Sequence, residues 1–475
     1  MEKIKNKKNN KDEIAGKKIK RKSAAKKGAT RKIERTKIKS LPKIDKAWVV
    51  AVNMGYGHQR TAHPLRSFAY KREIINANDY DGIPEQDKKI WKDSRRFYEA
   101  ISRFKRIPLI GKSMFSLYDN FFQKIVEFYP KKDLSRAPLL TRQTYALIKS
   151  GWGRHFVEKL KTKNLPLITT FFIPAFMAEE FDYPGKIYLV VCDADVSRQW
   201  APEYPISTRI NYCAPNKRVA ERLKLYGVPK KQIFLTGYPL PESNIATTRN
   251  GGIKEMNAVK ADLGRRLTNL DPVGAYSEKY CSFVKSALCA LPKKSRRVLT
   301  LMFSVGGAGA QKEIGMEIMR QMSPRVKNGR IKVIISVGTN RTMKDFYQRE
   351  AQFLGLGRNQ NLEILFEKDI KNYFNSFNKA LRQTDILWTK PSELSFYSAL
   401  GLPIIVAPPI GSQEDFNKSW LLRSGFGIEQ GNLCCINEWL DDWLDNGYLA
   451  EAAMEGFIEG EKLGTTNIKN LVFNK

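Results

Sequence analysis

The stretch "VVAVNMGYGHQRTAHPLRSFA", residues 49–69, joins a run of strand-forming residues directly to a helix-like segment. Its apolar, β-branched start is typical of a buried strand, and Gly55-Tyr56-Gly57-His58 follows as the turn. Glycines in such a turn allow close approach of the backbone to a ligand, and a helix N-terminus favours negative charge. The same residues also fit a tight turn that binds nothing, so the rest of the chain has to distinguish the two interpretations.

From Lys46 onward, short apolar runs alternate with segments of helical length. Near-continuous apolar strands in this alternation indicate buried parallel sheets with helices on both faces. We therefore predict an α/β fold of two doubly wound, Rossmann-like domains that face a cleft. The predicted strands are residues 47–53, 166–172, 186–192, 209–213 and 232–236 in the first half, and 298–304, 332–337, 362–366, 385–389 and 403–407 in the second.

The length of 475 residues also favours two domains, because a single core stops growing at roughly 250–300 residues. We expect a disordered basic tail over 1–46 and an N-terminal domain over 47–245. A connection over 246–296 without a strong strand then leads to a second domain over 297–430. Helices over 431–475 close the fold and are placed to cross back to the first domain.

The tail carries much of the charge. Residues 1–46 contain 19 Lys and Arg against 5 Asp and Glu, a net charge of +14, which leaves +20 of the total +34 for the other 429 residues. Such a segment can bind anionic lipid headgroups, bind nucleic acid through its phosphates, or only solubilise the chain. The tail alone does not separate these alternatives.

Other features narrow the class of protein. No uninterrupted apolar run reaches the roughly 18 residues that span a bilayer, and the N-terminus lacks the apolar region of a signal peptide. The six cysteines show no C-x-x-C spacing, which indicates reduced, mostly buried thiols in a cytosolic protein and no zinc site. We expect a cytoplasmic protein without a membrane span.

Two further turns resemble the first in their position after a strand. Residues 299–319, "LTLMFSVGGAGAQKEIGMEIM", lead through Gly306 to Gly309 into a helix, with a spacing unlike that of a nucleotidase P-loop. Residues 385–427 contain a strand, a Pro-Ser turn, a helix and a second strand. Beyond it, Gln413, Glu414 and Asn417 lie on a loop and the start of a helix, where they can offer polar groups to a ligand.

The order of these segments along residues 47–430 resembles the two-domain GT-B glycosyltransferases. Within them, the chain resembles a divergent member of the family that holds monogalactosyldiacylglycerol synthases, diacylglycerol glucosyltransferases and the peptidoglycan N-acetylglucosaminyltransferase. The resemblance lies in "NMGYGHQRTAHPL" (53–65), "VVCDADVSRQWAP" (190–202), "VGGAGAQ" (305–311) and "TKPSELSFYSALGLPIIVAPPIGSQEDFN" (389–417).

This resemblance implies an inverting transfer of a hexosyl group from a nucleotide-diphosphate sugar to a lipid or lipid-linked acceptor at the cytoplasmic face of the membrane, without a cofactor or an essential metal. The catalytic candidates are His58 and Asp193, and the acceptor-side residues are Gly55, Tyr56, Gly57 and Trp200. The donor-side residues are Gly306, Gly307, Ala308, Gly309, Gln311, Asn340, Lys390, Glu393, Ser398, Gln413, Glu414 and Asn417.

Either catalytic candidate can act as the base that takes a proton from the acceptor. The positive end of the helix dipole favours neutral imidazole at His58, and Asp193 follows a predicted strand and would face the cleft. Structural roles remain open for both residues. His58 can donate to a nearby carbonyl group, and Asp193 can cap a helix or turn.

Three positions depart from the family pattern. Ser197 stands where the family has histidine, Ser398 replaces the acid that holds the donor ribose, and Glu393 replaces a glycine. A serine can bind a hydroxyl group but offers no bidentate carboxylate. Two alternatives to the transferase therefore stay open: a GT-B-like binding protein that has lost catalysis, and another nucleotide-sugar enzyme such as a 2-epimerase.

The segment Trp91–Tyr129 interleaves aromatic residues with Lys and Arg. A helix of this composition can lie at a membrane interface, although its aromatic residues can equally form part of the core. With the basic tail, this segment favours an anionic membrane surface as a partner, and nucleic acid is the less favoured alternative.

Overall fold

The computed structural model describes residues 45–104, 125–246, 248–249, 252–253, 255–289, 297–306, 309 and 311–473. For residues 95–104, 248–249, 252–253 and 412, only the backbone is described. Residues 45–475 group as one compact unit. The predicted basic tail lies outside the described residues, apart from Asp45 and Lys46.

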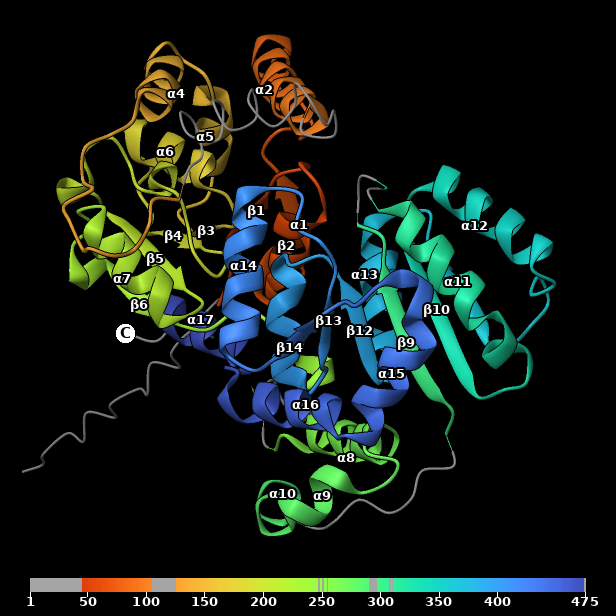
Figure 1. The fold of residues 1–475 in the computed structure, drawn as a ribbon. Helices are drawn as coiled ribbons and strands as arrows, with labels where there is room; N and C mark the ends of the chain where they lie inside the picture. The colour runs from red at the N-terminus through yellow and green to blue at the C-terminus, as the bar shows by residue number, and fades with distance from the viewer. Residues whose placement is uncertain are drawn as a thin grey trace, which may run out of the picture. The chain divides into compact units, whose positions relative to one another are not determined.

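The first half contains a six-stranded sheet in the order β2-β1-β3-β4-β5-β6, and every neighbouring pair is parallel (Figure 1). Strand β1 lies between β2 and β3, so the chain reverses its direction of travel across the sheet at the carboxyl ends of β1 and β3. Such a reversal leaves a crevice where ligands of doubly wound folds bind. The strands are β1 (Ala47–Ala51), β2 (Ala69–Asn76), β3 (Leu167–Thr169), β4 (Ile187–Val190), β5 (Ile210–Ala214) and β6 (Ile233–Leu235).

The second half contains another six-stranded parallel sheet, in the order β11-β10-β9-β12-β13-β14. Its reversal lies at the carboxyl ends of β9 and β12, after which the predicted donor-side turns begin. The prediction of two doubly wound, Rossmann-like α/β sheets is confirmed. The strands are β9 (Leu299–Ser304), β10 (Ile331–Gly338), β11 (Leu362–Phe366), β12 (Ile386–Thr389), β13 (Ile404–Val406) and β14 (Gly427–Glu429).

Two of the four edge strands, β2 and β14, were not predicted from the sequence, and both have a physical reason to be missed. Strand β2 reads "AYKREIIN" and exposes Lys71, Arg72 and Glu73, as expected for an edge strand that is protected by charge. Strand β14 reads "GIE" and has one large apolar residue. Neither strand carries the continuous apolar pattern that identifies the ten predicted strands.

The helices pack on both sheets, and several begin with a side-chain cap. Asn216, Asn340 and Asp369 precede α7, α12 and α13, and each accepts a hydrogen bond from the backbone N–H three residues on. In the first half the helices are α1 (Tyr56–Ala62), α2 (Glu85–Phe104), α4 (Leu139–Lys149), α5 (Arg154–Lys161), α6 (Phe172–Glu180) and α7 (Lys217–Leu225), with the 3-10 helix η1 (His63–Phe68). The later helices are α8 (Asn257–Leu270), α9 (Ala275–Lys279), α10 (Cys281–Leu288), α11 (Lys312–Lys327), α12 (Arg341–Phe353), α13 (Ile370–Leu381), α14 (Ser412–Arg423), α15 (Ile436–Asp445), α16 (Tyr448–Glu459) and α17 (Gly464–Phe473), with the 3-10 helix η7 (Glu393–Leu400).

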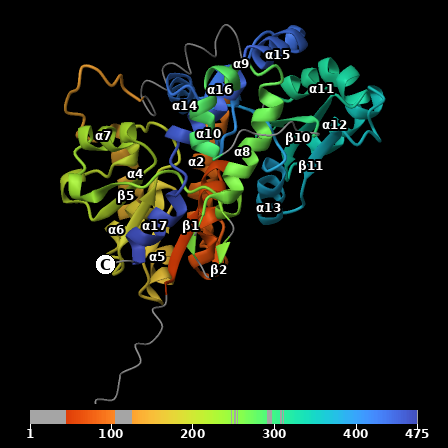
Figure 2. The ribbon, with the colours of Figure 1, turned by 90° about the horizontal axis from the view of Figure 1, so that it is seen from below.

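The last helix returns to the first sheet. In both views α17, at the blue end of the colour scale, lies among elements of the first half (Figure 1, Figure 2). Ile468 is fully buried in the core that covers one face of the first sheet, and the rings of Phe68 and Phe473 lie 5.7 Å apart. The hydroxyl of Tyr188 on β4 donates to the carbonyl oxygen of Leu471 over 3.4 Å. Helix α17 therefore packs on the first half.

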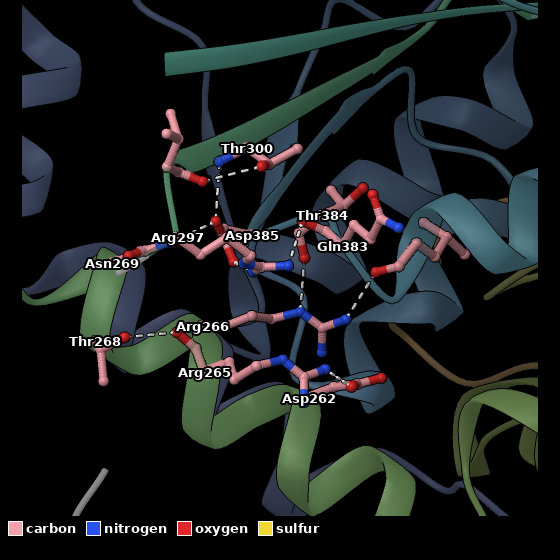
Figure 3. A network of polar contacts seen from close by, with 12 residues as sticks. Asp262, Arg265, Arg266, Thr268, Asn269, Arg297, Thr300, Gln383, Thr384 and Asp385 are labelled. Atoms are coloured by element: carbon pink, nitrogen blue, oxygen red, sulfur yellow. Dashed lines mark hydrogen bonds and ion pairs between the residues drawn. The ribbon is translucent and has the colours of Figure 1, made fainter. Parts of the chain in front are cut away.

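Helix α8, in the predicted connection, is anchored to the second half by a buried cation (Figure 3). The Arg266 guanidinium is 2% exposed and donates to the carbonyl oxygens of Thr384, Leu400 and Leu381 over 2.6–2.9 Å. Burial lowers the pKa of Arg266 to about 9. Beside it, Asp385 accepts from the Thr300 N–H at 2.9 Å and from the Asn269 amide at 2.8 Å. These contacts satisfy groups that would otherwise be costly to bury.

The remaining predictions about composition have mixed outcomes. None of the helices in the described part of the chain is long and apolar enough to cross a membrane. All six cysteines are free, but the expectation of mostly buried thiols was wrong, because only Cys192 and Cys213 are buried. Most of the aromatic and basic segment falls outside the described side chains. At its described ends, Trp91 is buried and Tyr129 is 69% exposed.

Candidate functional site

A pocket of about 500 Å³ lies where the reversal points of the two sheets meet. Its lining comes from the turn after β1, from the residues that follow β3 and β4, and from the turn after β12 and the start of α14. Eleven of the residues predicted from the sequence line this pocket: Gly55, Tyr56, Gly57, His58, Asp193, Trp200, Lys390, Glu393, Gln413, Glu414 and Asn417. Residues that are remote in sequence therefore share one cavity.

His58 is held in one tautomer. It is the third residue of α1, and its Nδ1 lies 2.8 Å from the carbonyl oxygen of Thr170, just after β3. Because a carbonyl oxygen only accepts, Nδ1 carries the hydrogen and Nε2 is the acceptor. Burial lowers the pKa of His58 to about 4, against smaller opposite effects of the Thr170 hydrogen bond and of Glu393. The imidazole is therefore neutral at neutral pH, as the helix position predicts, with Nε2 as its remaining acceptor.

Asp193 follows β4 and is held from the opposite half. Asn417 on α14 donates from Nδ2 to the Asp193 carboxylate at 3.1 Å, and the Asn417 carbonyl oxygen accepts from the Ala194 N–H at 2.7 Å. Burial is the main cause that raises the pKa of Asp193 to about 6, and the nearby Glu393 and Glu414 carboxylates raise it further. This value places the carboxyl group close to the pH at which a general base works best.

Cys192 lies between these two groups. Its Sγ is 3.5 Å from Nδ1 of His58 and 3.8 Å from Oδ2 of Asp193. Burial and the neighbouring carboxylates raise its pKa well above the ordinary thiol value. Cys192 is therefore a neutral thiol rather than a nucleophilic thiolate, and it packs the two candidate groups into a fixed arrangement.

Helix α1 is bound to the second half as well as to the first. The Tyr56 hydroxyl accepts from the Thr339 N–H at 2.8 Å and lies 3.0 Å from the Thr339 hydroxyl, just after β10. Gly338 is required for this contact, since a Cβ there would lie 2.3 Å from the Tyr56 hydroxyl oxygen and the residue has φ +69°. The glycine-rich turn after β1 therefore has a structural contact in addition to lining the pocket.

One turn further along α1, Arg60 meets Glu393. Arg60 Nε donates to the Glu393 carboxylate at 3.0 Å, and both side chains are at least nine-tenths buried. The guanidinium also lies over the rings of Phe377 and Phe374, at 4.2 and 4.9 Å from their centroids. On the pocket side, Glu393 Oε2 would lie 3.2 Å from a Cβ at Gly57. Glu393, at a position where the sequence resemblance predicts glycine, therefore has a defined partner and a carboxylate oxygen against the turn.

The cation of the pocket is Lys390, which follows β12. Its ammonium group pairs with the Glu414 carboxylate, whose other oxygen accepts from the Ile410 N–H at 2.7 Å. Gly306 lies beside it, since a Cβ there would be 3.5 Å from the Lys390 Cε atom. Lys390, in the third predicted turn, therefore lies next to Gly306, where the second predicted turn begins.

The other predicted donor-side residues are placed differently. A Cβ at Gly309 would lie 3.7 Å from the Asn340 amide nitrogen, and the Gln311 amide donates to the Pro408 carbonyl oxygen at 2.6 Å. Ser398 is 1% exposed, and its hydroxyl donates to the Ser395 carbonyl oxygen at 2.9 Å. Neither these four residues nor Gly306 line the pocket, which does include Ser197. Gly307 and Ala308 lie outside the described residues.

Several residues of the site were missed by sequence reasoning. Phe171 and Phe172 line the pocket just beyond β3, and the predicted strand 166–172 ran through them and hid their position at its carboxyl edge. Arg60 is outside the lining but pairs with Glu393, which lines the pocket; it lies four residues after Tyr56, so both occupy one face of α1, and this spacing was the available signal. Other lining residues without a sequence prediction are Asn53, Met54, Cys192, Gln199, Thr339 and Ser392.

The pocket therefore combines a neutral imidazole, a carboxyl group of raised pKa and one lysine. This set can move a proton and hold a negatively charged group. In the part of the chain that the structure describes, no cluster of three or more His, Cys, Asp or Glu side chains could hold a metal ion. The roles of the individual residues stay predictions.

Comparisons with known proteins give remote similarities. Residues 290–358 match a family described as "Domain of unknown function (DUF6938)". No curated protein matches the sequence. Among solved structures, the chain is similar to S. aureus MnaA with UDP, with a TM-score of 0.42 and 12% identity, over 70% of this chain and 81% of that one.

Two other solved structures are also remotely similar to the chain. The UDP-GlcNAc 2-epimerase from Neisseria meningitidis, bound to UDP-GlcNAc, has a TM-score of 0.37 and 12% identity over 70% of this chain and 83% of that one. The lipopolysaccharide outer core galactosyltransferase WaaB has a TM-score of 0.34 and 12% identity over 70% and 81%. At these scores, no ligand or activity of these proteins is assigned to this chain.

Proposed function

We infer that the protein is an enzyme of nucleotide-sugar chemistry, and that it transfers a hexosyl group from a nucleotide-diphosphate sugar to a hydroxyl acceptor with inversion. One observation carries this proposal: His58 and Asp193 lie in a single pocket with Lys390, at the reversal points of two doubly wound sheets. Crevices at such points are where folds of this type bind nucleotide ligands. The order of the sequence motifs supports the same chemistry.

In this proposal, Asp193 takes the proton from the acceptor hydroxyl. Its raised pKa keeps a useful basicity while leaving the carboxylate ionised at neutral pH. His58 is a weaker base, and its Nε2 can accept a hydrogen bond from the acceptor or from a sugar hydroxyl. The Asn417 amide fixes the orientation of the Asp193 carboxylate from the donor half.

In this proposal, the donor diphosphate binds beside Lys390 and Gly306. A lysine and the turn that precedes the N-terminus of α11 can neutralise the leaving group without a metal ion. Glu414 pairs with Lys390 and sets its position. The carboxylates of Asp193, Glu393 and Glu414 in the same lining make Lys390 the residue on which anion binding most depends.

The finer features of the proposal are a lipid or lipid-linked acceptor, attachment to the anionic cytoplasmic face of the membrane, and a cytoplasmic location. They are supported by the resemblance to lipid glycosyltransferases and by the net charge of +14 in residues 1–46. Nucleic acid is the alternative partner of the basic tail.

The first experiment is a thermal-shift screen with nucleotide-diphosphate sugars. A ligand at 100 times its dissociation constant should stabilise the protein by about 2.7 kcal/mol. The variant Lys390→Met should abolish this shift. The control Lys418→Met removes a lysine that pairs with Glu429 outside the pocket and should retain the shift. If no nucleotide sugar stabilises the wild-type protein, the proposal is wrong.

A second experiment identifies the reaction. The donor that stabilises the protein is labelled in its sugar and incubated with a lipid extract, and the label is followed into the organic phase. Asp193→Asn should stop transfer while it retains donor binding. Label that stays in water as a new sugar, in the absence of lipid, would instead show the alternative of epimerase chemistry.

The binding-protein alternative has an observation in its favour. Ser398 stands at the position of the ribose-binding acid, but its hydroxyl is buried and donates to the Ser395 carbonyl oxygen. A donor ribose therefore needs another partner, for which the pocket offers Gln413 and Glu414. Binding of a nucleotide without turnover of any sugar, together with salt-sensitive binding to anionic vesicles, would favour this alternative.

A further inference from the structure

A second cavity, of about 650 Å³, lies beyond the end of α1. It is lined by η1 and the turn in β2, by residues 241–243 and by α13. Its lining shares no residue with that of the candidate functional site. Successive turns of one segment thus face two different cavities: His58 lines the candidate functional site and His63 lines the second cavity.

The second cavity is strongly cationic. Arg66, Arg72, Lys379 and Arg382 line it, and Glu242 is the only acidic residue among the described residues of its lining. Arg382 pairs with Asp262, over 3.0 Å. Among the described residues, the side chains of Arg66, Arg72 and Lys379 have no ion-pair partner. Three of the four cations therefore remain available to an anion, in a space of the size that small ligands occupy.

The backbone brings two of these cations together. Lys71 and Arg72 have φ values of +53° and +56°, a conformation that residues with a side chain seldom adopt. In this conformation the Arg72 carbonyl oxygen accepts from Arg66 Nε at 2.7 Å. The bond fixes Arg66, from η1, next to Arg72, from β2. Strained positions of this kind concentrate at functional sites.

Nearby positive charges act on His63, which also lines the second cavity. Its Nε2 lies 3.1 Å from the Asn375 amide oxygen on α13. Burial is the main cause that lowers the pKa of His63 to about 4, and the charges of Arg66, Arg60 and Lys371 lower it further. Of these three cations, Arg66 belongs to the lining, so its charge acts on another residue of the same cavity.

The uncharged part of the lining offers hydrogen bonds. Asn378 is 8% exposed, and its Oδ1 has no hydrogen-bond partner among the described residues. Asn375 and Ser243 add an amide and a hydroxyl group. The Asn378 oxygen is itself covered, so the Asn375 amide and the Ser243 hydroxyl, both exposed, are the groups that can bond a ligand hydroxyl group. The cavity therefore matches a molecule with both a doubly charged anionic group and hydroxyl groups.

We propose that this cavity binds a small phosphate monoester that carries hydroxyl groups, such as a sugar phosphate, at a site separate from the candidate functional site. Arg72 and Lys379 bind the phosphate together with the free part of the Arg66 guanidinium, because guanidinium and ammonium groups suit phosphate oxygens. The Asn375 amide and the Ser243 hydroxyl bond the hydroxyl groups of the ligand. Since η1 and β2 belong to the first half and α13 to the second, the bound molecule contacts both halves.

Isothermal titration calorimetry tests the proposal with glucose 1-phosphate, inorganic phosphate and glucose as probes. Glucose 1-phosphate should bind with a stoichiometry of one, at least tenfold more tightly than inorganic phosphate, and glucose should not bind. The double variant Arg72→Glu/Lys379→Glu should weaken glucose 1-phosphate binding at least tenfold. The matched control Lys71→Glu/Lys371→Glu has the same net charge but changes neighbours outside the lining, and should change the affinity less than threefold.

Two further measurements locate the ligand. At pH 7, glucose 1-phosphate should shift the imidazole signal of His63 and leave that of His58 unchanged, with His63→Asn used for assignment. Lys390→Met should bind glucose 1-phosphate as the wild type does. Equal affinity for phosphate and glucose 1-phosphate, equal weakening by both double variants, or loss of binding in Lys390→Met alone would overturn the proposal.

Discussion

Arg60 Nε donates to the carboxylate of Glu393 at 3.0 Å, and the two side chains are only 3% and 10% exposed. This pair joins the helix after β1 to the turn after β12, which are the reversal points of two different sheets. The resemblance predicts a glycine at position 393. The structure instead gives this position an acidic residue whose partner comes from the other half of the chain.

Breaking this pair should cost stability. Arg60→Met or Glu393→Leu alone leaves one buried charge without its partner, which typically costs about 3–5 kcal/mol. The double variant removes both charges and should recover much of the loss. The exposed pair Lys418–Glu429 is the control, and its removal should cost about 1 kcal/mol or less. Urea denaturation followed by circular dichroism measures these differences, and an additive double variant would contradict the coupling.

The raised pKa of Asp193 should also make the stability of the protein depend on pH. The folded protein holds this proton up to about pH 6, while the unfolded chain releases it near pH 3.8. The folded state thus binds more protons between these values, so stability falls as the pH rises through this window. Asp193→Asn keeps the acceptor for Asn417 and should be roughly 1–3 kcal/mol more stable than wild type at pH 7, with little difference at pH 3.5. Denaturation at both pH values tests this sign.

If Asp193 is the base, the pH dependence of turnover should follow it. The rate should fall as the pH drops through about 6, where Asp193 takes up a proton. Glu393→Gln removes a carboxylate that raises the Asp193 pKa, so the acid limb should move to lower pH. Glu429→Gln, outside the pocket, should leave the limb in place. A limb that does not respond to Glu393→Gln would argue against Asp193 as the titrating group.

Two of the three histidines should stay neutral in mild acid. The pKa values of His58 and His63 are lowered to about 4, mainly by burial. Nuclear magnetic resonance should therefore show neither imidazole titrating between pH 7.5 and 5.5, with His58→Asn and His63→Asn for assignment. Because the unfolded chain takes up these protons near pH 6.5, each histidine should also reduce stability as the pH falls from 6.5 to 4. Titration of either signal near pH 6.5 would contradict its burial.

Gly338 should tolerate no side chain. Gly338→Ala places a Cβ 2.3 Å from the Tyr56 hydroxyl oxygen and in a left-handed conformation. Gly355→Ala is a close control: its φ is +68°, but a Cβ there lies at least 3.5 Å from its neighbours. The control should cost only the roughly 1–2 kcal/mol of the left-handed conformation. Gly338→Ala should cost clearly more and weaken nucleotide binding. Equal losses in the two variants would show that the contact with Tyr56 is not required.

The central strands and their order of appearance were predictable from the sequence. Buried parallel strands are almost continuously apolar, and ten such runs stand out between Ala47 and Ala407. The placement of His58, Asp193 and Lys390 in one cavity was also predictable. Each lies within a few residues of the carboxyl end of a strand, and the carboxyl ends of parallel strands share one edge. The edge strands β2 and β14 were not predictable by the same pattern, because charged residues interrupt the first and the second, "GIE", has only one large apolar residue.

Local apolar pattern and turn chemistry are therefore enough to predict the two doubly wound sheets and the residues at their carboxyl edges. The partner of each side chain depends on the tertiary fold. In the folded protein Glu393 pairs with Arg60, the Ser398 hydroxyl is buried in the core, Asp193 accepts from Asn417, and the cations of the second cavity come together from η1, β2 and the end of α13. These pairings join residues hundreds of positions apart, and their burial sets the pKa values, which no local pattern in the chain encodes.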